Sequence, residues 1–229
     1  LLHRQLRIAA YLRIDHVMSL HRLFWIPEGM SPADGVYVKY RPEEMYAVYC
    51  LESHLHQTGI IGENLGTVPP EVNRSMRRHG LRHMHVVQYE LEADEQQHHA
   101  LDARCIASLN THDIPMFAAW WQGDDLPMRH ELGLLDDEGY EQERQRREQL
   151  RVALVNRLYD AGWLQQRDPD LPTVTSAVEK FLAASPAELM LVNLEDLWGE
   201  TRPQNIPGTA SERPNWKRKS AWSMEQMEG

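Results

Sequence analysis

Three acidic side chains in this chain of 229 residues come shortly after short apolar segments: Asp15, Glu63 and Asp113. Three carboxylates that converge on one site are suited to two kinds of reaction. In glycosyl transfer, one carboxylate attacks the anomeric carbon and one carboxylic acid protonates the leaving oxygen. In a two-metal phosphoryl site, the acids hold the ions. Each acid alone also fits a simpler role, such as solvating a turn or closing a strand end with an ion pair.

The neighbours of these acids favour sugar chemistry over metal chemistry. Arg13 and His112 are hydrogen-bond donors beside Asp15 and Asp113, which suits recognition of hydroxyl groups and competes with divalent cations. Arg13 and Asp15 stand two apart on an expected strand and therefore share a side. Arg13 either closes the strand end in an ion pair or keeps Asp15 ionised and oriented for catalysis.

Composition excludes several partners. A formal net charge of −10 argues against nucleic acid or an anionic membrane surface as a partner. No apolar run is long enough to span a bilayer. The two cysteines, Cys50 and Cys105, form no disulfide framework or metal motif, so we expect buried free thiols and a cytoplasmic protein. The first residues carry no initiator Met, so we expect a piece of a longer polypeptide.

The elements that position the acids alternate between strand and helix. Apolar runs and helical spacing predict strands over 11–17, 59–62, 81–89, 104–109 and 186–196, and helices over 1–10, 42–56, 70–79, 117–121 and 173–184. Alternation of this kind predicts an α/β fold with parallel strands and right-handed crossovers. The carboxyl ends of parallel strands share one edge, so we expect Asp15, Glu63 and Asp113 to converge there.

The remaining segments have less regular patterns. Residues 19–40 read as a long irregular loop rich in exposed aromatics, including Trp25, which suits packing against sugar rings. The helix over 42–56 carries apolar Met45, Val48, Tyr49 and Leu55 on one face. Residues 123–185 form a mostly helical segment between the strands ending at Asp113 and Asp196, and the charged run 141–151 reads as a solvated helix face.

Several short motifs occur together in a specific order. They are Arg13-Ile14-Asp15-His16, Phe24-Trp25-Ile26-Pro27-Glu28-Gly29, Gly62-Glu63-Asn64-Leu65-Gly66-Thr67-Val68-Pro69, Thr111-His112-Asp113, and Asn205-Ile206-Pro207-Gly208-Thr209 with Asn215-Trp216. In this order they resemble the 4-alpha-glucanotransferases of glycoside hydrolase family 77, the amylomaltases or disproportionating enzymes. The likeness runs over nearly the whole chain.

The resemblance implies a TIM (β/α)8 barrel with active-site loops at the strand carboxyl ends. Residues 1–229 then form the C-terminal portion of that catalytic barrel, covering roughly strands 4 to 8. The first three strands and part of the glucan groove are absent from this chain on that reading. We therefore expect the chain alone not to convert maltotriose efficiently.

The resemblance also implies roles for individual residues. Asp15 resembles the nucleophile that forms the covalent glycosyl-enzyme, Glu63 the general acid/base, and Asp113 the third acid, which holds sugar hydroxyls. Substrate contacts are implied for Arg13, His112, Trp25 and Asn205. The implied reaction moves α-1,4-glucan segments between malto-oligosaccharides, with glucose as a further acceptor, and uses no metal or organic cofactor.

One position departs from the family pattern: Asn64 stands where the family usually has Asp. Loss of that negative neighbour makes it easier for Glu63 to lose its proton, so we expect Asn64 to reduce the rate. Two alternatives to transfer stay open at this point. One is an α-glucan hydrolase of the same clan, and the other is a truncated glucan-binding fragment without catalysis.

Overall fold

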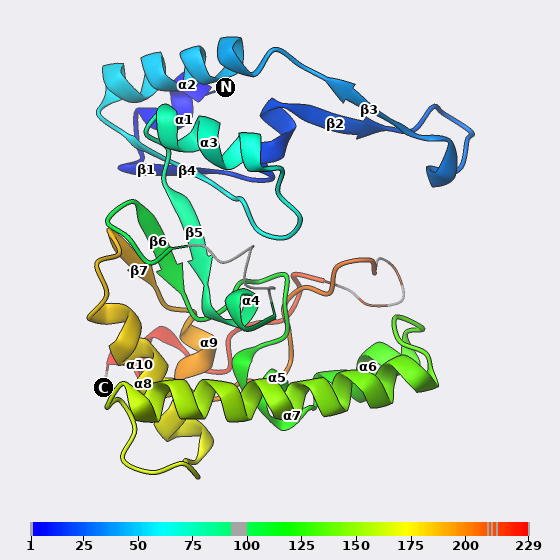
Figure 1. Cartoon of the computed structure of the whole chain (residues 1–229), viewed down its shortest axis with the longest axis vertical. Helices are drawn as coiled ribbons and strands as arrows, with labels where there is room; N and C mark the ends of the chain where they lie inside the picture. Colours follow the sequence, from blue (N-terminus) through cyan, green and yellow to red (C-terminus); the bar gives the residue numbers. More distant parts are fainter. Residues whose placement is uncertain (1, 93–99, 210, 212, 214, 229) are drawn as a thin grey trace. The chain divides into compact units, whose positions relative to one another are not determined.

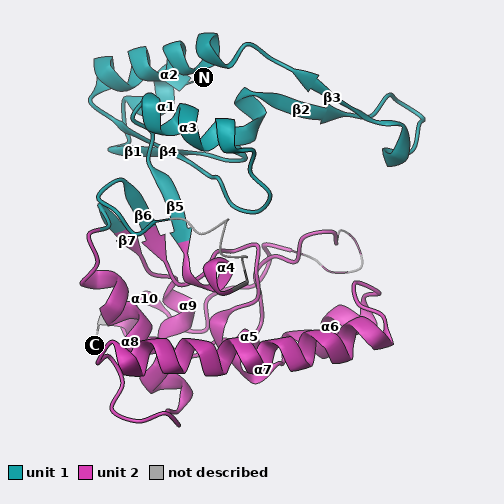
Figure 2. Cartoon of the chain, viewed as in Figure 1, with its two compact units in different colours: residues 1–85, 99–106, 187–189 teal, residues 86–98, 107–186, 190–229 magenta. Residues whose placement is uncertain are grey.

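The computed structural model describes residues 2–92, 100–209, 211, 213 and 215–228, and the chain divides into two compact units (Figure 2). Unit 1 comprises residues 1–85, 99–106 and 187–189, and unit 2 comprises residues 86–98, 107–186 and 190–229. Helices and strands are interleaved along the chain (Figure 1), which confirms the mixed α/β class.

A parallel pair of strands in unit 1 carries two of the three acids. Strand β1 (Tyr11–Ile14) pairs with β4 (Gly59–Gly62), with Tyr11 opposite Gly59 and Ile14 opposite Gly62. Glycine lets neighbouring side chains approach both ends of β4 closely, because a Cβ at Gly59 would lie 2.5 Å from the Tyr11 ring and one at Gly62 would lie 2.7 Å from the terminal methyl group of Met76. The expected strand at 59–62 is therefore confirmed.

Helices and a short 3₁₀ helix cover this pair in unit 1. They are α1 (Leu2–Leu6), α2 (Pro42–His56), α3 (Pro70–Arg78) and η1 (Val17–Leu20). Helices α2 and α3 each begin with proline at the first helical position. The backbone nitrogen at that position makes no hydrogen bond within the helix, so the missing N–H of proline costs no helical hydrogen bond. The buried core cluster of unit 1 consists of Leu6, Val17, Met18, Leu20, Tyr46, Ile60, Val72, Met76 and Leu81.

Most of the apolar residues that were predicted to share one face of α2 do not pack on the core of unit 1. Tyr46 is the buried side chain and Tyr49 packs against the core cluster, whereas Met45, Val48 and Leu55 are exposed. The phenol of Tyr46 lies 3.2 Å from His21 Nε2 and its ring stacks on the His79 ring at 4.7 Å. Burial raises the pKa of Tyr46 to about 12. The buried position on α2 is therefore occupied by an amphipathic tyrosine with polar partners, and not by one of the aliphatic residues.

The expected irregular loop over 19–40 is a β-hairpin instead. Strand β2 (Arg22–Trp25) pairs antiparallel with β3 (Val36–Lys39), and η2 (Pro32–Asp34) lies in the connection between them. Figure 1 shows this hairpin as a long arm of unit 1. Residues on both faces of the arm are exposed, so the sequence lacks the alternation of polar and apolar residues that marks a half-buried strand. The expected exposure of Trp25 is confirmed.

A second sheet contains three strands in the order β5-β6-β7, with β5 at His83–Val86, β6 at Cys105–Ser108 and β7 at Leu189–Leu191. Two expectations are corrected here. The strand expected through Tyr89 stops at Val86, because helix α4 (Val87–Glu92) begins there. The acids Glu195 and Asp196 lie in the short helix α9 (Leu194–Leu197) and not at a strand end.

Unit 2 is mainly helical, with α5 (Phe117–Gln122), α6 (Asp125–Glu131), α7 (Asp137–Asp160), α8 (Leu171–Ala183) and α10 (Met224–Glu228). Asp136 and Asp170 cap α7 and α8, each accepting a hydrogen bond from the backbone N–H three residues on. The charged run on α7 is only partly a solvated face, because Arg147 is buried. Its pairing is described below.

Within the described part of the chain, the strands form three small sheets and no closed barrel, and a parallel bridge joins Ile61 of β4 to Arg82, just before β5. No helix in that part is both long and apolar enough to cross a membrane. Cys105 is buried and Cys50 is partly exposed, and both thiols are free.

Candidate active site

Asp15 and Glu63 stand at neighbouring positions just past the carboxyl ends of β1 and β4. The ladder that pairs Ile14 with Gly62 continues by one step, because the Glu63 N–H donates to the Ile14 carbonyl at 2.8 Å. The N–H of Val17 in turn donates to the Glu63 carbonyl at 2.9 Å. Parallel strands lie about 4.8 Å apart, so this register brings the two acidic residues side by side in unit 1.

Backbone N–H groups fix the Glu63 carboxylate. Its Oε2 accepts from the N–H of His16 at 2.9 Å and its Oε1 accepts from the N–H of Leu65 at 2.7 Å. His16 has a φ of 47°, in the left-handed region that non-glycine residues rarely occupy. The turn at His16 directs its N–H at the carboxylate. Glu63 is thus held in one orientation, as proton transfer to a bound group requires.

Arg13 of β1 holds Asp15, which lies just past the carboxyl end of that strand. Arg13 Nη2 lies 2.8 Å from Asp15 Oδ1, which confirms that the two side chains share a side of β1. The Asp15 side chain is 76% exposed. An ion pair this open to water contributes about 0–1 kcal/mol to stability, so its main effect is to orient the carboxylate.

The hairpin arm of unit 1 presents aromatic surface. Trp25, Phe24 and Tyr37 are exposed, and Trp25 Nε1 donates to the Tyr40 hydroxyl at 3.0 Å. The rings of Phe24 and Tyr37 meet edge to face with centroids 5.1 Å apart. Exposed aromatic faces of this kind pack well against the C–H faces of sugar rings.

Asp113 belongs to unit 2, where it is held by side chains. Asn205 Nδ2 donates to Asp113 Oδ1 at 2.7 Å, and His112 Nε2 lies 3.1 Å from Asp113 Oδ2. The His112 ring also lies 5.3 Å from the ring of Trp216. The structure therefore groups three of the predicted site residues, Asp113, His112 and Asn205. The convergence of Asp113 with Asp15 and Glu63 stays a prediction.

The loop that carries Asn205 is anchored by a residue of the same motif. The Ile206 N–H donates to Asn215 Oδ1 at 3.1 Å, and Asn215 Nδ2 donates to the Thr209 hydroxyl at 3.0 Å. Gly208 lies within this turn with a φ of 85°, a conformation that favours glycine. The motifs at 205–209 and 215–216 are therefore a single structural element.

Asp113 and Asn205 line a cavity of about 450 Å³ in unit 2. Its lining includes Gln88, Trp120 and Arg147, so it combines an apolar wall with hydrogen-bonding groups. Cavities of this size and character are typical of sites for small ligands.

Buried charges that the sequence did not reveal support this part of unit 2. Arg147 on α7 pairs with Asp125 at 3.0 Å and with Glu143 at 3.0 Å, and it donates to the Trp120 carbonyl at 2.9 Å. Asp196 accepts from Asn110 Nδ2 at 3.1 Å and from the Phe117 N–H at 3.3 Å.

The pKa of Asp196 lies well above the ordinary value of an aspartate. Burial raises the pKa of Asp196 to about 6, although its hydrogen bonds to Asn110 and to the Phe117 N–H act in the opposite direction. Because Asn110 and Phe117 flank the segment that carries Asp113, Asp196 is a positioning residue for that segment. Because Asp196 is far from Asp113 along the chain, this positioning role cannot be predicted from the local sequence.

Asn64, the position that departs from the family pattern, is part of the hydrogen-bonded core of unit 1. It is 1% exposed, its Nδ2 donates to Asn73 Oδ1 at 2.9 Å, and its Oδ1 accepts from the Met84 N–H at 3.0 Å. A set of side chains able to hold a metal, His3, Glu52 and His56, occurs elsewhere in unit 1.

Parallel strands, covering helices and carboxylates fixed at strand ends define an α/β protein with acidic groups at the carboxyl edge of its sheet. The chain belongs to glycoside hydrolase family 77, 4-alpha-glucanotransferase, whose family model matches residues 1–224. The family-level resemblance seen in the motifs is therefore confirmed.

Individual relatives agree with this assignment. The chain is 35% identical to the 4-alpha-glucanotransferase of Mycobacterium tuberculosis over 224 residues, which cover 95% of this chain and 31% of the relative. It is 34% identical to that of Haemophilus influenzae over 218 residues, which cover 92% of this chain and 31% of the relative. The chain thus spans about a third of the length of these relatives.

Solved structures resemble the chain as well. The amylomaltase of Corynebacterium glutamicum superposes with a TM-score of 0.82 and 28% identity, covering 94% of this chain and 32% of that one. The amylomaltase of Streptococcus agalactiae gives a TM-score of 0.64 at 19% identity, covering 95% of this chain and 38% of that one, which is a likeness of fold.

Proposed function

We propose that this chain carries the catalytic acids of a 4-alpha-glucanotransferase that moves α-1,4-glucan segments between malto-oligosaccharides. The single observation that carries the proposal is the β1–β4 register, which sets Asp15 and Glu63 side by side at the strand ends. The family match over residues 1–224 supports the substrate class.

In the proposed reaction, Asp15 attacks the anomeric carbon while Glu63 protonates the leaving glycosidic oxygen. The resulting bond joins the donor segment to Asp15. Glu63 then removes a proton from the 4-hydroxyl of the acceptor, which attacks and releases the lengthened glucan with retained configuration. Retaining enzymes hold their two carboxyl groups about 5–5.5 Å apart, and the spacing between neighbouring strands is compatible with that separation.

The other predicted residues have supporting roles in this proposal. Asp113 is the third acid, which holds sugar hydroxyls, and Asn205 and His112 orient it. Arg13 orients Asp15, and Trp25 offers an aromatic face to the glucan. No metal or organic cofactor is required by these steps. Free cysteines are compatible with a cytoplasmic enzyme acting on malto-oligosaccharides and glucose.

We also propose that the fold is the part of a (β/α)8 barrel that covers roughly strands 4 to 8. The likeness to the Corynebacterium glutamicum amylomaltase over 94% of the chain supports this. Residues 123–185, with α6, α7 and α8, would be a helical segment between two strands of that barrel. The proposed acids then lie at the carboxyl ends of strands, where barrels of this type place catalysis.

The test uses this chain with an activated donor, because a single turnover suffices to detect a covalent intermediate. The chain is mixed with α-maltotriosyl fluoride and analysed by mass spectrometry after proteolysis, and its products from maltotriose are separated in parallel. We expect a glycosyl adduct on Asp15 from the activated donor. Because the chain alone is expected to convert maltotriose inefficiently, we expect only a slow formation of glucose together with oligosaccharides longer than maltotriose.

Three outcomes would contradict the proposal. An adduct on another residue would remove Asp15 as nucleophile. Glucose and maltose without longer products would identify a hydrolase. The absence of both an adduct and any new oligosaccharide would leave glucan binding without catalysis, and binding of maltotriose in the same sample would then identify the non-catalytic alternative.

A further inference from the structure

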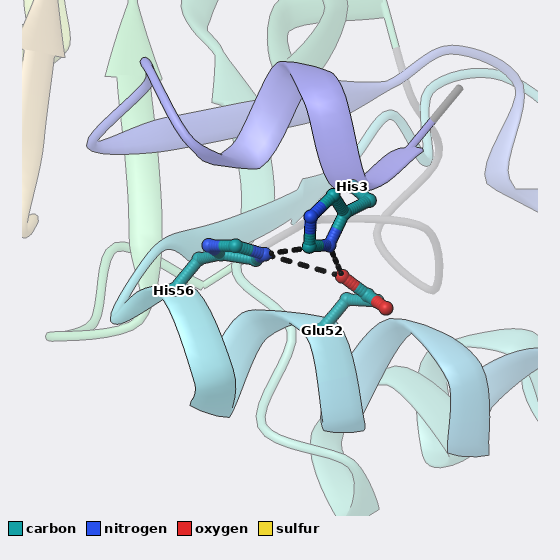
Figure 3. Close-up of side chains that lie close together, drawn as sticks. All are labelled: His3, Glu52 and His56. Carbon is teal, nitrogen blue, oxygen red and sulfur yellow. Dashed lines mark hydrogen bonds and ion pairs between the residues drawn. The ribbon is translucent and has the colours of Figure 1, made fainter.

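Three side chains of unit 1 form a compact triangle away from the proposed active site: His3, Glu52 and His56 (Figure 3). His3 comes from α1, and Glu52 and His56 stand one turn apart on α2. His3 Nδ1 lies 3.1 Å from Glu52 Oε2, His56 Nε2 lies 3.4 Å from the same oxygen, and the two nitrogens are 3.0 Å apart.

Hydrogen bonds alone do not account for this triangle. The ionised carboxylate of Glu52 only accepts, and each imidazole nitrogen either donates or accepts. If both nitrogens carry protons, both donate to Glu52 and two N–H groups face each other across 3.0 Å. If only one nitrogen carries a proton, the lone pair of the other faces the carboxylate oxygen. With Glu52 ionised, each of these arrangements leaves at least one of the three edges repulsive, whereas a cation between the atoms satisfies all three.

We propose that His3, Glu52 and His56 bind one divalent transition-metal ion of the zinc type. Zinc bonds to histidine nitrogen and carboxylate oxygen are about 2.0–2.2 Å long, so tetrahedral ligand atoms lie about 3.4 Å from one another. The observed edges of 3.0 to 3.4 Å are close to that value. Two imidazoles and one carboxylate favour zinc over Mg²⁺ or Ca²⁺, which prefer an all-oxygen set.

The fourth position of this site is open to water. The His3 side chain is 60% exposed, so solvent reaches the metal from that side. His56 and Glu52 are more buried and provide the fixed part of the site. The glutamate and histidine four residues apart on one helix face need no rearrangement to bind the ion together.

The position of the site indicates a structural role. His56 ends α2 just before β4 begins at Gly59, whereas Glu63 follows the other end of β4. Four strand residues span about 13 Å, so the metal site and the carboxylate lie at opposite ends of the strand. Helix α1 packs against α2, and its Leu6 belongs to the buried core cluster of unit 1. A shared ion fastens α1 to α2.

The experiment titrates Zn²⁺ into the untagged, metal-free chain by calorimetry, with Mg²⁺ as a comparison ion. The variants are His3→Ala, Glu52→Gln and His56→Gln. The matched control is His54→Ala, which removes an exposed histidine from the same helix. Circular dichroism establishes that each variant is folded, and the midpoint of thermal unfolding is measured with and without Zn²⁺.

We expect one Zn²⁺ per chain for the unaltered protein and for His54→Ala, and loss of this binding in the three site variants. Saturating Zn²⁺ at a hundredfold excess over Kd should raise the Tm by roughly 5–10 °C in the unaltered chain only. If the two variants on α2 do not fold, His3→Ala decides, since its side chain lies mostly in solvent. Zinc binding that survives His3→Ala, or no stoichiometric binding by the unaltered chain, would overturn the proposal.

Discussion

Glu63 in unit 1 and Asp113 in unit 2 are held in different ways. The Glu63 carboxylate accepts two backbone N–H groups, and the strand register sets the position of the residue itself. The Asp113 carboxylate is held by the side chains of His112 and Asn205, and Asn205 lies 92 residues further along the chain. One acid is therefore fixed by local backbone geometry and the other by a distant loop.

Charge is distributed differently in the two units as well. The ion pair of Asp15 with Arg13 in unit 1 is open to water, where it orients a reactive group at little energetic cost. The carboxylate of Asp125 in unit 2 is only 2% exposed and depends on Arg147. Substitutions in unit 1 should thus alter reactivity, whereas those at the buried charges of unit 2 should alter stability.

The largest expected effect is that of Asp15→Asn on reactivity. The amide cannot form the glycosyl ester, so adduct formation and maltotriose conversion should fall by about 10³-fold or more. The matched control is Asp168→Asn, the same change at an exposed position of unit 2. Thermal unfolding should be the same for both variants. An Asp15→Asn variant that retains a tenth of the rate would mean that Asp15 is not the nucleophile.

The largest expected effect on stability comes from Arg147→Ala. Among the residues that the structure describes, it leaves the buried Asp125 carboxylate with Arg129, 3.8 Å away, as its remaining cationic partner. Removing one partner of a buried pair costs about 3–5 kcal/mol, measured as the free energy of unfolding in urea. Arg144→Ala on the same helix breaks an exposed pair with Glu141 and should change little. Equal losses for the two variants would contradict the distinction between buried and exposed pairs.

These two substitutions also separate what the sequence revealed from what it did not. Asp15 and Glu63 were predictable, because an apolar strand ending in glycine and a carboxylate has a local pattern and parallel strands share an edge. Arg147 was not, because the run 141–151 is uniformly charged and only the position of Asp125 shows which arginine is buried. Tertiary packing decides which one of many charged side chains is buried, and the local sequence does not indicate which one it is.

The same limit explains the other corrections. The sequence of the hairpin β2–β3 predicts a loop because both of its faces are exposed and leave no alternating pattern. In α2, Tyr46 is buried, and its hydroxyl group lies within hydrogen-bond distance of His21. The triangle of His3, Glu52 and His56 had a partial signal, since Glu52 and His56 are four apart on a predicted helix. The third member, His3, comes from another helix, so local spacing in the sequence could not predict that it joins the other two.

Asp196→Asn tests the buried acid of unit 2 through pH. The pKa of Asp196 lies above its ordinary value of 3.8, at about 6, so the folded state holds this proton more tightly than the unfolded state does. Its contribution to stability is greatest below pH 4 and is lost as the pH rises to 6, a change of about 3 kcal/mol. The neutral amide should therefore stabilise the chain by about 1–3 kcal/mol at pH 7.5.

Urea unfolding of both proteins between pH 4 and pH 7.5 checks this prediction. The advantage of Asp196→Asn should shrink as the pH falls and should be absent near pH 4, where Asp196 is itself protonated. Asp168→Asn serves again as the control and should show no such trend. An advantage that is the same at both pH values would mean that the substitution acts through packing and not through the charge.

Asn205→Ala probes how far Asp113 depends on its distant partner. The substitution removes the donor 2.7 Å from Asp113 Oδ1 and leaves His112 in place, so we expect a rate about tenfold lower, equivalent to about 1.4 kcal/mol. Initial rates of formation of oligosaccharides longer than maltotriose measure it. Asn156→Ala, an asparagine of α7 in the same unit, is the control. An unchanged rate for Asn205→Ala would show that His112 alone holds Asp113.

The smallest expected effect is that of Asn64→Asp, and its direction is informative. A negative charge at position 64 helps Glu63 keep its proton, so the rate of transfer should rise a few-fold. The same carboxylate would be buried, and although the Met84 N–H can still donate to it, Asn73 must turn its amide to replace the donor it faces now. We therefore expect a loss of about 1 kcal/mol in the free energy of unfolding beside the gain in rate.

Initial rates and urea unfolding of the Asn64→Asp variant check both parts. A rate that is unchanged or lower would reject the influence of position 64 on Glu63. If the rate rises while the free energy of unfolding falls, then asparagine at this buried position favours stability, whereas aspartate favours the rate of transfer.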